Sequence, residues 1–221
     1  MPKFLITGSN RGIGLELTRQ LQERGDYVIA TCRNTSEELI NLGVNIIDNV
    51  DISSGHSITK LKSKLKDIKL DCLIHNAGIA EYNSFEDLDP ESIKKQFDIN
   101  ALSPLCMTRS LINLFNKKSK IAFITSRMGS IDDNTSGSSY GYRMSKVALS
   151  MAAKSLSIDL IKKEIFVGIL HPGLVSTRMT GYTNNGISTK ESAKGLLERI
   201  DSLNSSNSGK FFHANGEELP W

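Results

Sequence analysis

Short apolar runs recur along this chain, separated by longer segments in which apolar residues return at helical spacing. The apolar runs are continuous rather than alternating, which is typical of strands that are buried on both faces of a sheet. Strands are predicted at Lys3–Thr7, Tyr27–Cys32, Val44–Asn49, Leu70–His75, Ser119–Thr125, Phe166–Leu170 and Lys210–His213.

The segments between these runs carry apolar residues every three or four positions, as amphipathic helices do. Helices are predicted at Ile13–Glu23, Glu37–Leu42, His56–Lys66, Glu91–Phe115, Tyr142–Lys162 and Thr189–Ile200. Regular alternation of strands and helices favours an α/β fold with a doubly wound parallel sheet of about seven strands and helices on both faces. No repeat or low-complexity linker interrupts the pattern, so residues 1–221 are expected to form one domain.

Composition supports a single globular unit without a nucleic-acid partner. Of the 221 residues, 39% are hydrophobic and 23% charged, and the net charge of +3 is mild. The densest basic run, Lys60–Lys66, surrounds an apolar stripe with lysines, as expected of a solvated helix face. It contains none of the arginines and aromatic side chains that often accompany nucleic-acid-binding patches.

The cysteines indicate a reducing compartment, and the apolar runs are too short to cross a membrane. Cys32, Cys72 and Cys106 have a spacing that suits neither a metal site nor a disulfide framework, so they are expected to be small core residues. No apolar run approaches the roughly 18 residues that cross a bilayer, and the first predicted strand leaves no room for a signal peptide. A cytoplasmic protein with no membrane partner is expected.

The first predicted strand leads through three glycines into a helix. The turn contains Gly8, Asn10, Arg11, Gly12, Ile13 and Gly14, with the spacing Gly-x-x-x-Gly-x-Gly. Glycine lets a backbone approach a pyrophosphate, and a helix N-terminus offers unpaired N–H groups and a dipole that favours an anion. Tight turns also use glycine, but the place between strand and helix favours dinucleotide binding by these residues.

Tyr142 and Lys146 lie four residues apart in a predicted helix, so their side chains share one face. A phenol titrates at about 10, and a positive charge within about 4 to 6 Å favours the phenolate. The pair is therefore expected to have a lowered tyrosine pKa, suited to general acid or base catalysis. Taken alone, the pair could also be part of an ordinary helix surface.

These motifs occur in a fixed order with others: Thr7-Gly8-x-x-x-Gly12-x-Gly14, Asn76-Ala77-Gly78, Asn100, Ser126 and Tyr142-x-x-x-Lys146. Their order and gaps resemble the short-chain dehydrogenase/reductase family from Lys3 to Pro172-Gly173. The short C-terminal half, with its ending Gly209-Lys210-Phe211-Phe212 to Trp221, resembles the C-factor-like branch of small carbonyl reductases. The resemblance implies a Rossmann-like domain that binds NAD or NADP.

The resemblance also implies roles for two polar residues near the catalytic pair. Asn100 would kink a long helix and hold a water that links Lys146 to solvent, and Ser126 would hydrogen-bond the substrate carbonyl. Each has a simpler alternative: Asn100 could be a solvated polar residue, and a serine at the end of a strand often serves only a turn. Its apolar neighbours Ile99, Ala101 and Leu102 weaken the first alternative.

Further cofactor contacts are implied at three places. Asn76, Ala77 and Gly78 would let the cofactor pass close to the fourth strand. Asp51 and Ile52 match the position that recognises adenine, where a surface turn is the alternative reading. The nicotinamide would be lined by Pro172, Gly173, Val175 and Thr177.

The choice of cofactor can be argued from the end of the second predicted strand. NAD-binding proteins of this fold carry an acidic residue there for the ribose 2′-OH, and here the residues are Thr31-Cys32-Arg33-Asn34. Arg33 could bind a 2′-phosphate, and Arg11 could add a second contact as in NADP-preferring members of the family. NADP(H) is therefore expected rather than NAD(H), unless both arginines are merely solvent-facing.

Together these residues imply hydride transfer between the nicotinamide and a carbonyl or alcohol substrate. Tyr142, Lys146, Ser126 and Asn100 are the candidate catalytic residues, and the first two would also contact the cofactor. No metal is expected, and the histidines, His75 among them, are expected to be structural. The alternative is a non-catalytic dinucleotide-sensing or signalling protein, which would need the glycines but not the catalytic set.

The predicted long helices also resemble those that pair across the family's common four-helix interface, so a homodimer or homotetramer is expected. Its apolar surface is predicted to consist of Met107, Leu111, Leu114, Leu149 and Leu156, unless these residues pack on their own sheet. The substrate pocket is predicted to be bordered by the loops Ile79–Phe85, Met128–Tyr140 and Leu174–Ser188.

Overall fold

The computed structural model describes residues 1–221 and contains one seven-stranded sheet in the order β3-β2-β1-β4-β5-β6-β7. Every neighbouring pair of strands is parallel. The strands are β1 (Lys3–Thr7), β2 (Tyr27–Thr31), β3 (Asn45–Ile47), β4 (Leu70–His75), β5 (Phe115–Ile124), β6 (Phe166–His171) and β7 (Phe211–His213). The predicted fold class is confirmed.

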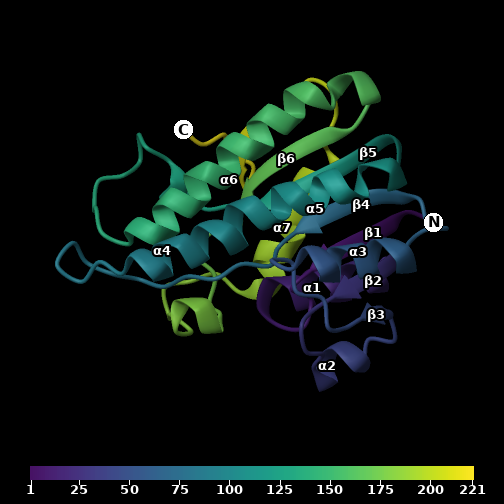
Figure 1. Cartoon of the computed structure of the whole chain (residues 1–221), viewed down its shortest axis with the longest axis horizontal. Helices are drawn as coiled ribbons and strands as arrows, with labels where there is room; N and C mark the ends of the chain where they lie inside the picture. Colours follow the sequence, from purple (N-terminus) through teal and green to yellow (C-terminus); the bar gives the residue numbers. More distant parts are fainter.

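Helices cover both faces of this sheet (Figure 1). The helices are α1 (Gly12–Glu23), α2 (Glu37–Ile40), α3 (Gly55–Lys64), α4 (Pro90–Phe97), α5 (Ser103–Leu111), α6 (Tyr140–Asp159) and α7 (Thr189–Asp201). Helices α3, α5 and α6 pack on one face, and α1 and α7 pack on the other. No helix is both long and apolar enough to cross a membrane.

The continuous apolar strands fill both cores because neighbouring side chains point to opposite faces. Leu5 packs among the residues under α3, α5 and α6, whereas Phe4 and Ile6 pack under α1 and α7. The sheet changes winding direction at β1, which pairs with β2 on one side and β4 on the other. In such sheets, ligands bind beyond the carboxyl ends of the strands at this point.

The predicted long helix Glu91–Phe115 is wrong in its extent. The structure breaks it into α4, a π-helical turn η1 (Asp98–Leu102), α5 and a short 3₁₀ turn η2 (Ile112–Leu114), and Phe115 already belongs to β5. Pro104 lies in the first turn of α5 and has no N–H to continue the hydrogen bonds of the preceding turn. The other differences between predicted and observed elements are smaller and lie at the ends of the elements. For example, β3 contains only Asn45–Ile47.

The residues predicted for a subunit interface belong instead to the core. The inner faces of α5, η2 and α6 carry these residues, of which Met107, Leu111, Leu114 and Leu149 are buried and Leu156 is partly buried against the same cluster.

The prediction that all three cysteines are core residues is wrong for one of them. Cys32 and Cys72 are buried, but Cys106 is exposed, because it lies on the outer face of α5.

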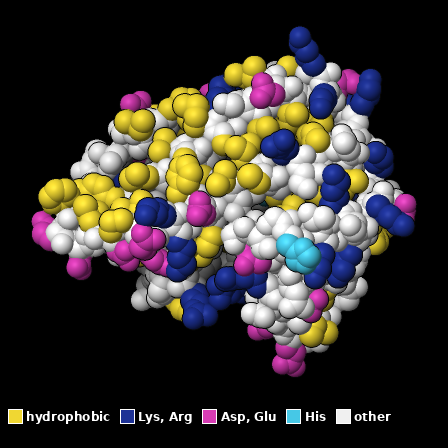
Figure 2. Space-filling model, in the orientation of Figure 1, with side chains coloured by type: hydrophobic (Ala, Val, Ile, Leu, Met, Phe, Trp, Pro, Cys, Tyr) yellow, Lys and Arg dark blue, Asp and Glu magenta, His cyan; other side chains and the backbone are white.

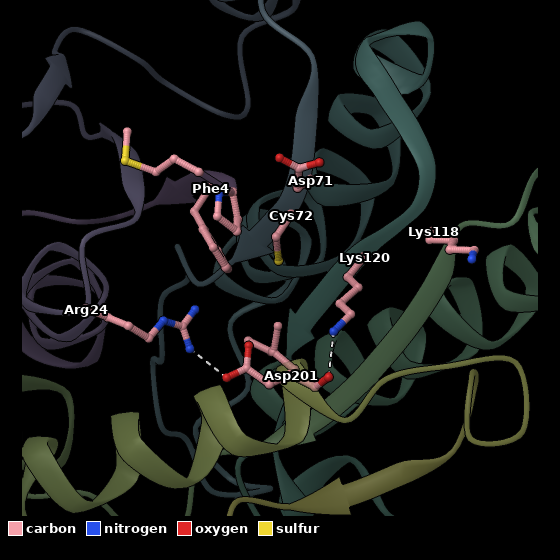
Figure 3. A pocket seen from close by; sticks show the side chains of 10 residues that line it. Phe4, Arg24, Asp71, Cys72, Lys118, Lys120 and Asp201 are labelled. Carbon is pink, nitrogen blue, oxygen red and sulfur yellow. Dashed lines mark hydrogen bonds and ion pairs between the residues drawn. The ribbon is translucent and has the colours of Figure 1, made fainter.

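A charged hollow lies at the opposite edge of the sheet, near the amino ends of β1, β4 and β5 (Figure 3). Arg24 at the end of α1 bonds the carboxylate of Asp201 at 2.6 Å, and the Lys120 ammonium donates to the Asp201 carbonyl at 2.7 Å. These exposed pairs contribute at most about 1 kcal/mol each. They tie the ends of α1, α7 and β5 together, away from the carboxyl edge.

We expect Gly195→Ala to destabilise the fold by about 1–3 kcal/mol, because a Cβ at this position in α7 would lie 2.5 Å from the carbonyl oxygen of Ala214. Gly55→Ala is the control, since a Cβ there would meet nothing within 4 Å and alanine favours a helix. Urea denaturation of the two variants measures the difference. Equal stabilities would contradict the close contact between α7 and the end of β7.

Candidate active site

The glycine turn between β1 and α1 has a conformation that favours glycine. Gly8 and Gly12 have φ angles of +68° and +56°. A Cβ on Gly14 would collide with the Gly8 carbonyl and the Asn76 side chain. The predicted turn is therefore a compact backbone surface, and Gly14 allows α1 to start directly against it.

The N-terminus of α1 has no side-chain cap. Its N-cap residue, Arg11, makes no side-chain capping bond, and no acidic residue occupies the first turn. By contrast, α3, α4 and α7 are capped by the side chains of Ser54, Asp89 and Ser188. A phosphate group would supply the acceptors that the first turn of α1 lacks.

Two arginines lie beside this uncapped helix start. Arg11 and Arg33 are exposed, and neither guanidinium bonds another group of the chain. Asn10 connects the glycine turn to the segment after β2, since its side-chain amide donates to the Asn34 carbonyl at 2.8 Å. In Figure 2, Lys and Arg side chains gather in the hollow between the part of the surface around α4 and the part around α2. The residues present therefore fit a phosphorylated nucleotide.

The turns after β1 and β4 are bonded to each other. The Thr7 hydroxyl accepts from the backbone N–H groups of Asn76 and Ala77 at 3.0 and 3.1 Å. The Asn76 amide donates back to the carbonyls of Thr7 and Gly8 at 3.0 and 3.1 Å. The predicted motif at Asn76–Gly78 thus fixes the shape of the glycine turn, and the small residues Ala77 and Gly78 leave space above it.

Asp51 and Ile52 lie after β3, at the outer end of the same edge. The Asp51 carboxylate accepts from the backbone and the hydroxyl of Ser53 at 2.9 and 2.7 Å, and these bonds lower its pKa. Ile52 is partly buried against the core beneath α3 and α5. The Asp51 carboxylate is thus engaged in a turn, and the positive charge of Arg33 adds a smaller lowering of its pKa.

Tyr142 and Lys146 are buried together in the first turns of α6, with 8% and 6% of their surfaces exposed. The ordinary helix surface considered as an alternative is therefore wrong. The Lys146 ammonium donates to the Ile124 carbonyl at 3.0 Å and lies 5.6 Å from the centre of the Tyr142 ring. Burial lowers the pKa of Lys146 to about 8.

The expected lowering of the tyrosine pKa is wrong for this state of the protein. Burial raises the pKa of Tyr142, the neighbouring Tyr82 phenol raises it further, and the Ser126 hydroxyl lowers it. Loss of water around the phenolate outweighs attraction to a lysine that bonds a carbonyl instead. Tyr142 therefore holds its proton at neutral pH, which is the form that a proton donor needs.

Ser126 lies next to Tyr142 where β5 passes into a short 3₁₀ turn, η3 (Arg127–Gly129). Its hydroxyl accepts from the Met128 N–H at 3.1 Å. The preceding Thr125 donates to the backbone carbonyl of Lys146 at 3.1 Å, which fixes α6 against the end of β5. The residues after β5 therefore place the Ser126 hydroxyl beside the Tyr142 phenol and the Thr125 hydroxyl against α6.

Asn100 lies at the π-helical turn η1 and is 1% exposed, so the predicted interruption of a long helix occurs where expected. Its side-chain amide accepts from the Ile79 N–H and donates to the Ile79 carbonyl, both at 2.8 Å. It also donates to the Ser145 hydroxyl at 3.0 Å. A Cβ on Gly78 would lie 3.0 Å from the Asn100 oxygen and 3.7 Å from the Lys146 ammonium. Asn100 and Lys146 thus border the same small space.

The segment after β6 faces the glycine turn. Gly173 has a φ angle of +89°, and Pro172 accepts from the Ser192 hydroxyl at 2.7 Å. The methyl group of Thr177 would lie 3.7 Å from a Cβ on Gly12. The Val175 carbonyl accepts from Thr180 in the short turn η5 (Arg178–Thr180). Thr177 therefore lies beside the turn that precedes α1, and Pro172, Gly173 and Val175 belong to the same short segment.

The structure adds one residue that the motifs do not include. Tyr82 follows the Asn100-bound segment, and its ring centre lies 6.0 Å from that of Tyr142. The sequence predicted that the loop Ile79–Phe85 borders the substrate pocket, but a lone aromatic residue in a loop has no helical or strand periodicity that would single out Tyr82. Its proximity to Tyr142 depends entirely on how the loop folds back onto α6.

The histidines lie outside this constellation of side chains. His75 is buried, stacks on Phe123 and bonds the Thr108 hydroxyl at 2.8 Å, and burial lowers its pKa to about 3. His171 and His213 pack edge to face with ring centres 4.9 Å apart. No three His, Cys, Asp or Glu side chains gather as metal ligands.

Comparison with known proteins gives the same family. The chain matches the model of the family described as short chain dehydrogenase over residues 3–188. It is 37% identical to 1-hydroxy-2-glutathionyl-2-methyl-3-butene dehydrogenase of Rhodococcus sp. (strain AD45), over 100% of both chains. It is 41% identical to the C-signal protein of Myxococcus xanthus, over 69% of this chain and 93% of that protein.

Among solved structures, the NADPH-bound carbonyl reductase from chicken fatty liver aligns with a TM-score of 0.90 and 28% identity, covering 100% of this chain and 99% of that one. The family match, the sheet order and the motif geometry agree with one another. This chain belongs to the short-chain dehydrogenase/reductase family of oxidoreductases.

Proposed function

We propose that this protein is an NADP(H)-dependent carbonyl reductase in which Tyr142 donates the proton. The observation that carries the proposal is the burial of Tyr142 and Lys146 next to Ser126, at the same sheet edge as an uncapped helix N-terminus. A general acid and an anion-binding turn at one edge suit a reaction between a carbonyl compound and a phosphorylated cofactor.

The glycine turn and the uncapped start of α1 would hold the pyrophosphate, and Arg33 and Arg11 would bind the 2′-phosphate of NADP(H). Asp51 and Ile52 would border the adenine, and Pro172–Thr177 would border the nicotinamide. Bound NADPH would supply the hydride for reduction of a carbonyl carbon. The NADPH-bound carbonyl reductase of chicken fatty liver supports this choice of cofactor.

The side chains at the carboxyl edge would then handle the proton and the oxygen. Tyr142, protonated at neutral pH, donates to the oxygen that gains negative charge, and the Ser126 hydroxyl orients that oxygen. Lys146 with a pKa of about 8 is mostly protonated at pH 7 and adds positive charge to the site. Asn100 fixes the segment beside the Lys146 ammonium and supports proton supply to it.

The signalling alternative has its own support, because one relative is the C-signal protein of Myxococcus xanthus. A protein that only senses dinucleotides needs the anion-binding turn but does not need a buried phenol beside a buried ammonium. Burying two such groups is costly, so their retention favours turnover. Turnover by the wild type is therefore the observation that separates the two functions.

We also propose a homodimer formed through the outer face of α6. Met144, Met151 and Ile158 recur every seven residues and are 51%, 65% and 65% exposed. Hydrophobic side chains form rows on this face of the molecule, over α6 and its neighbours (Figure 2). We propose this exposed stripe in place of the core residues that the sequence suggested, because large apolar side chains exposed along one helix face favour association.

Tyr142→Phe is expected to lower kcat/KM for an aldehyde by at least about 100-fold and to leave the Kd of NADPH nearly unchanged, because only proton donation is lost. Nicotinamide absorbance measures turnover, and calorimetry measures cofactor binding. Tyr140→Phe is the control and should be mild, since Tyr140 has Met144 rather than lysine four residues on. Most of the wild-type rate remaining in Tyr142→Phe would remove this residue from the mechanism.

Arg33→Ala is expected to weaken NADPH binding by roughly 10-fold and to change NADH binding little, because an exposed charge-assisted bond contributes at the lower end of its usual range. Titration of each cofactor against the enzyme gives the two affinities. Arg109→Ala, on α5, should alter neither. Equal wild-type affinities for NADPH and NADH would contradict the assignment of Arg33 to the 2′-phosphate.

Met151→Glu is expected to convert the dimer to a monomer, because it places a charge in the centre of the exposed stripe. Light scattering after size exclusion, at micromolar concentration, measures the mass. Lys162→Glu, beyond the end of α6, also introduces a glutamate, but outside the stripe, and should leave the dimer intact. A wild type that is already monomeric would be the opposing result.

A further inference from the structure

Two buried amide side chains fix the loop that follows β4. Asn100 bonds both the N–H and the carbonyl of Ile79, as described above. Gln96, one helical turn earlier and fully buried, does the same for Glu81: it accepts from the Glu81 N–H at 3.0 Å and donates to the Glu81 carbonyl at 3.1 Å. The two amides act on alternate residues, as a neighbouring strand would.

Gln96 also lies beneath the turn that carries Tyr142. A Cβ on Gly141 would lie 2.6 Å from the Gln96 amide nitrogen, so α4 and α6 are in close contact at this point. The Glu81 carboxylate is bonded in turn by Ser92 and Lys95 of the same helix, at 2.6 and 2.7 Å. Gln96 therefore couples the position of residues 79–81 to the first turn of α6.

This loop presents two aromatic rings to α6. Tyr82 lies 6.0 Å from Tyr142 with the ring planes tilted by 59°, and Phe85 lies 6.2 Å from Tyr140 with a tilt of 54°. Between them, the Asn83 carbonyl accepts from the Ser139 N–H at 2.8 Å. Tyr82 is 55% exposed although it borders a buried catalytic candidate. The exposed part of the Tyr82 ring is thus available to a substrate that approaches Tyr142.

We propose that Tyr82 forms the specificity-determining wall of the substrate site, that Gln96 is the positioning residue which holds it, and that the site favours carbonyl compounds with a flat aromatic group next to the carbonyl. The proposal rests on the carbonyl reductase function proposed above. A carbonyl that reaches Tyr142 places its adjacent substituent against the exposed part of the Tyr82 ring. A flat apolar group gains contact area and ring interaction there that a puckered ring does not.

The test compares benzaldehyde with cyclohexanecarbaldehyde, which differ in planarity more than in size. The wild type should prefer benzaldehyde by roughly three- to ten-fold in kcat/KM. Tyr82→Phe should keep this preference, and Tyr82→Ala should abolish it through a higher KM for benzaldehyde with kcat little changed. A preference that survives in Tyr82→Ala would overturn the assignment of the wall.

Gln96→Met, which has similar length but forms neither amide bond, should reduce the preference by raising KM for benzaldehyde. It should also speed hydrogen exchange of the Glu81 amide, which Gln96 bonds directly, whereas Gln22→Met on the exposed side of α1 should change neither quantity. If Gln96 only stabilises the fold, Gln96→Met should lower the free energy of unfolding without changing the ratio of kcat/KM between the two aldehydes. Unchanged exchange at Glu81 would refute the role of Gln96.

Binding of benzyl alcohol and cyclohexylmethanol, measured by saturation-transfer NMR, tests the wall without turnover. Wild type should bind the aromatic alcohol in preference, and Tyr82→Ala should not. A wild type that shows this preference but reduces neither aldehyde would contradict the proposed reaction and leave the wall supported. A wild type that binds the two alcohols equally would refute the wall whatever its activity.

Discussion

The burial of a parallel sheet on both of its faces is the constraint on which the rest of this structure depends. Strands such as β1 send Leu5 into one core and Ile6 into the other, so both faces of the sheet are mostly apolar, and a buried polar side chain such as His75 is hydrogen-bonded within the core. Polar side chains that take part in binding or chemistry are therefore confined to the edges of the sheet. The carboxyl edge carries the glycine turn and the Tyr142 region, whereas the charges at the amino edge include the bonded pair Arg24 and Asp201.

At the carboxyl edge, side-chain amides replace the backbone partners that irregular segments lack. Asn76 holds the glycine turn, Asn100 holds Ile79, and Gln96 holds Glu81, each through more than one bond. A buried N–H or carbonyl without a partner costs free energy, so each amide fixes a backbone segment that could otherwise not be buried. This fixation lets loops, rather than strands, carry the aromatic and small residues around Tyr142.

The electrostatics of Tyr142 and Lys146 show a competition between burial and charge. Spacing alone suggests that lysine lowers the tyrosine pKa, but burial acts on both groups and favours the neutral form of each. The Lys146 ammonium is stabilised by the Ile124 carbonyl rather than by the phenol. The result is a protonated phenol beside a lysine of unusually low pKa, an arrangement suited to donating a proton rather than removing one.

The sequence by itself determined the order of strands and helices, the glycine turn and the Tyr142–Lys146 pair, because each depends on local periodicity or on the backbone freedom of glycine. Through the family resemblance it predicted a kink at Asn100, but it did not show that the segment from Glu91 divides into separate helices that end before β5 begins at Phe115. The Asn100 hydrogen bonds that accompany this break reach Ile79 and Ser145, which are distant in the sequence. It also misassigned Met107 and Leu149, since an apolar residue on an amphipathic helix does not reveal whether it faces its own sheet or a second molecule. Only the tertiary structure brought Tyr82 and Gln96 close to the first turn of α6, because the distance between segments far apart in the sequence depends on the packed chain. It also decided that the pKa of Tyr142 is raised rather than lowered, because loss of water around the phenol follows from burial.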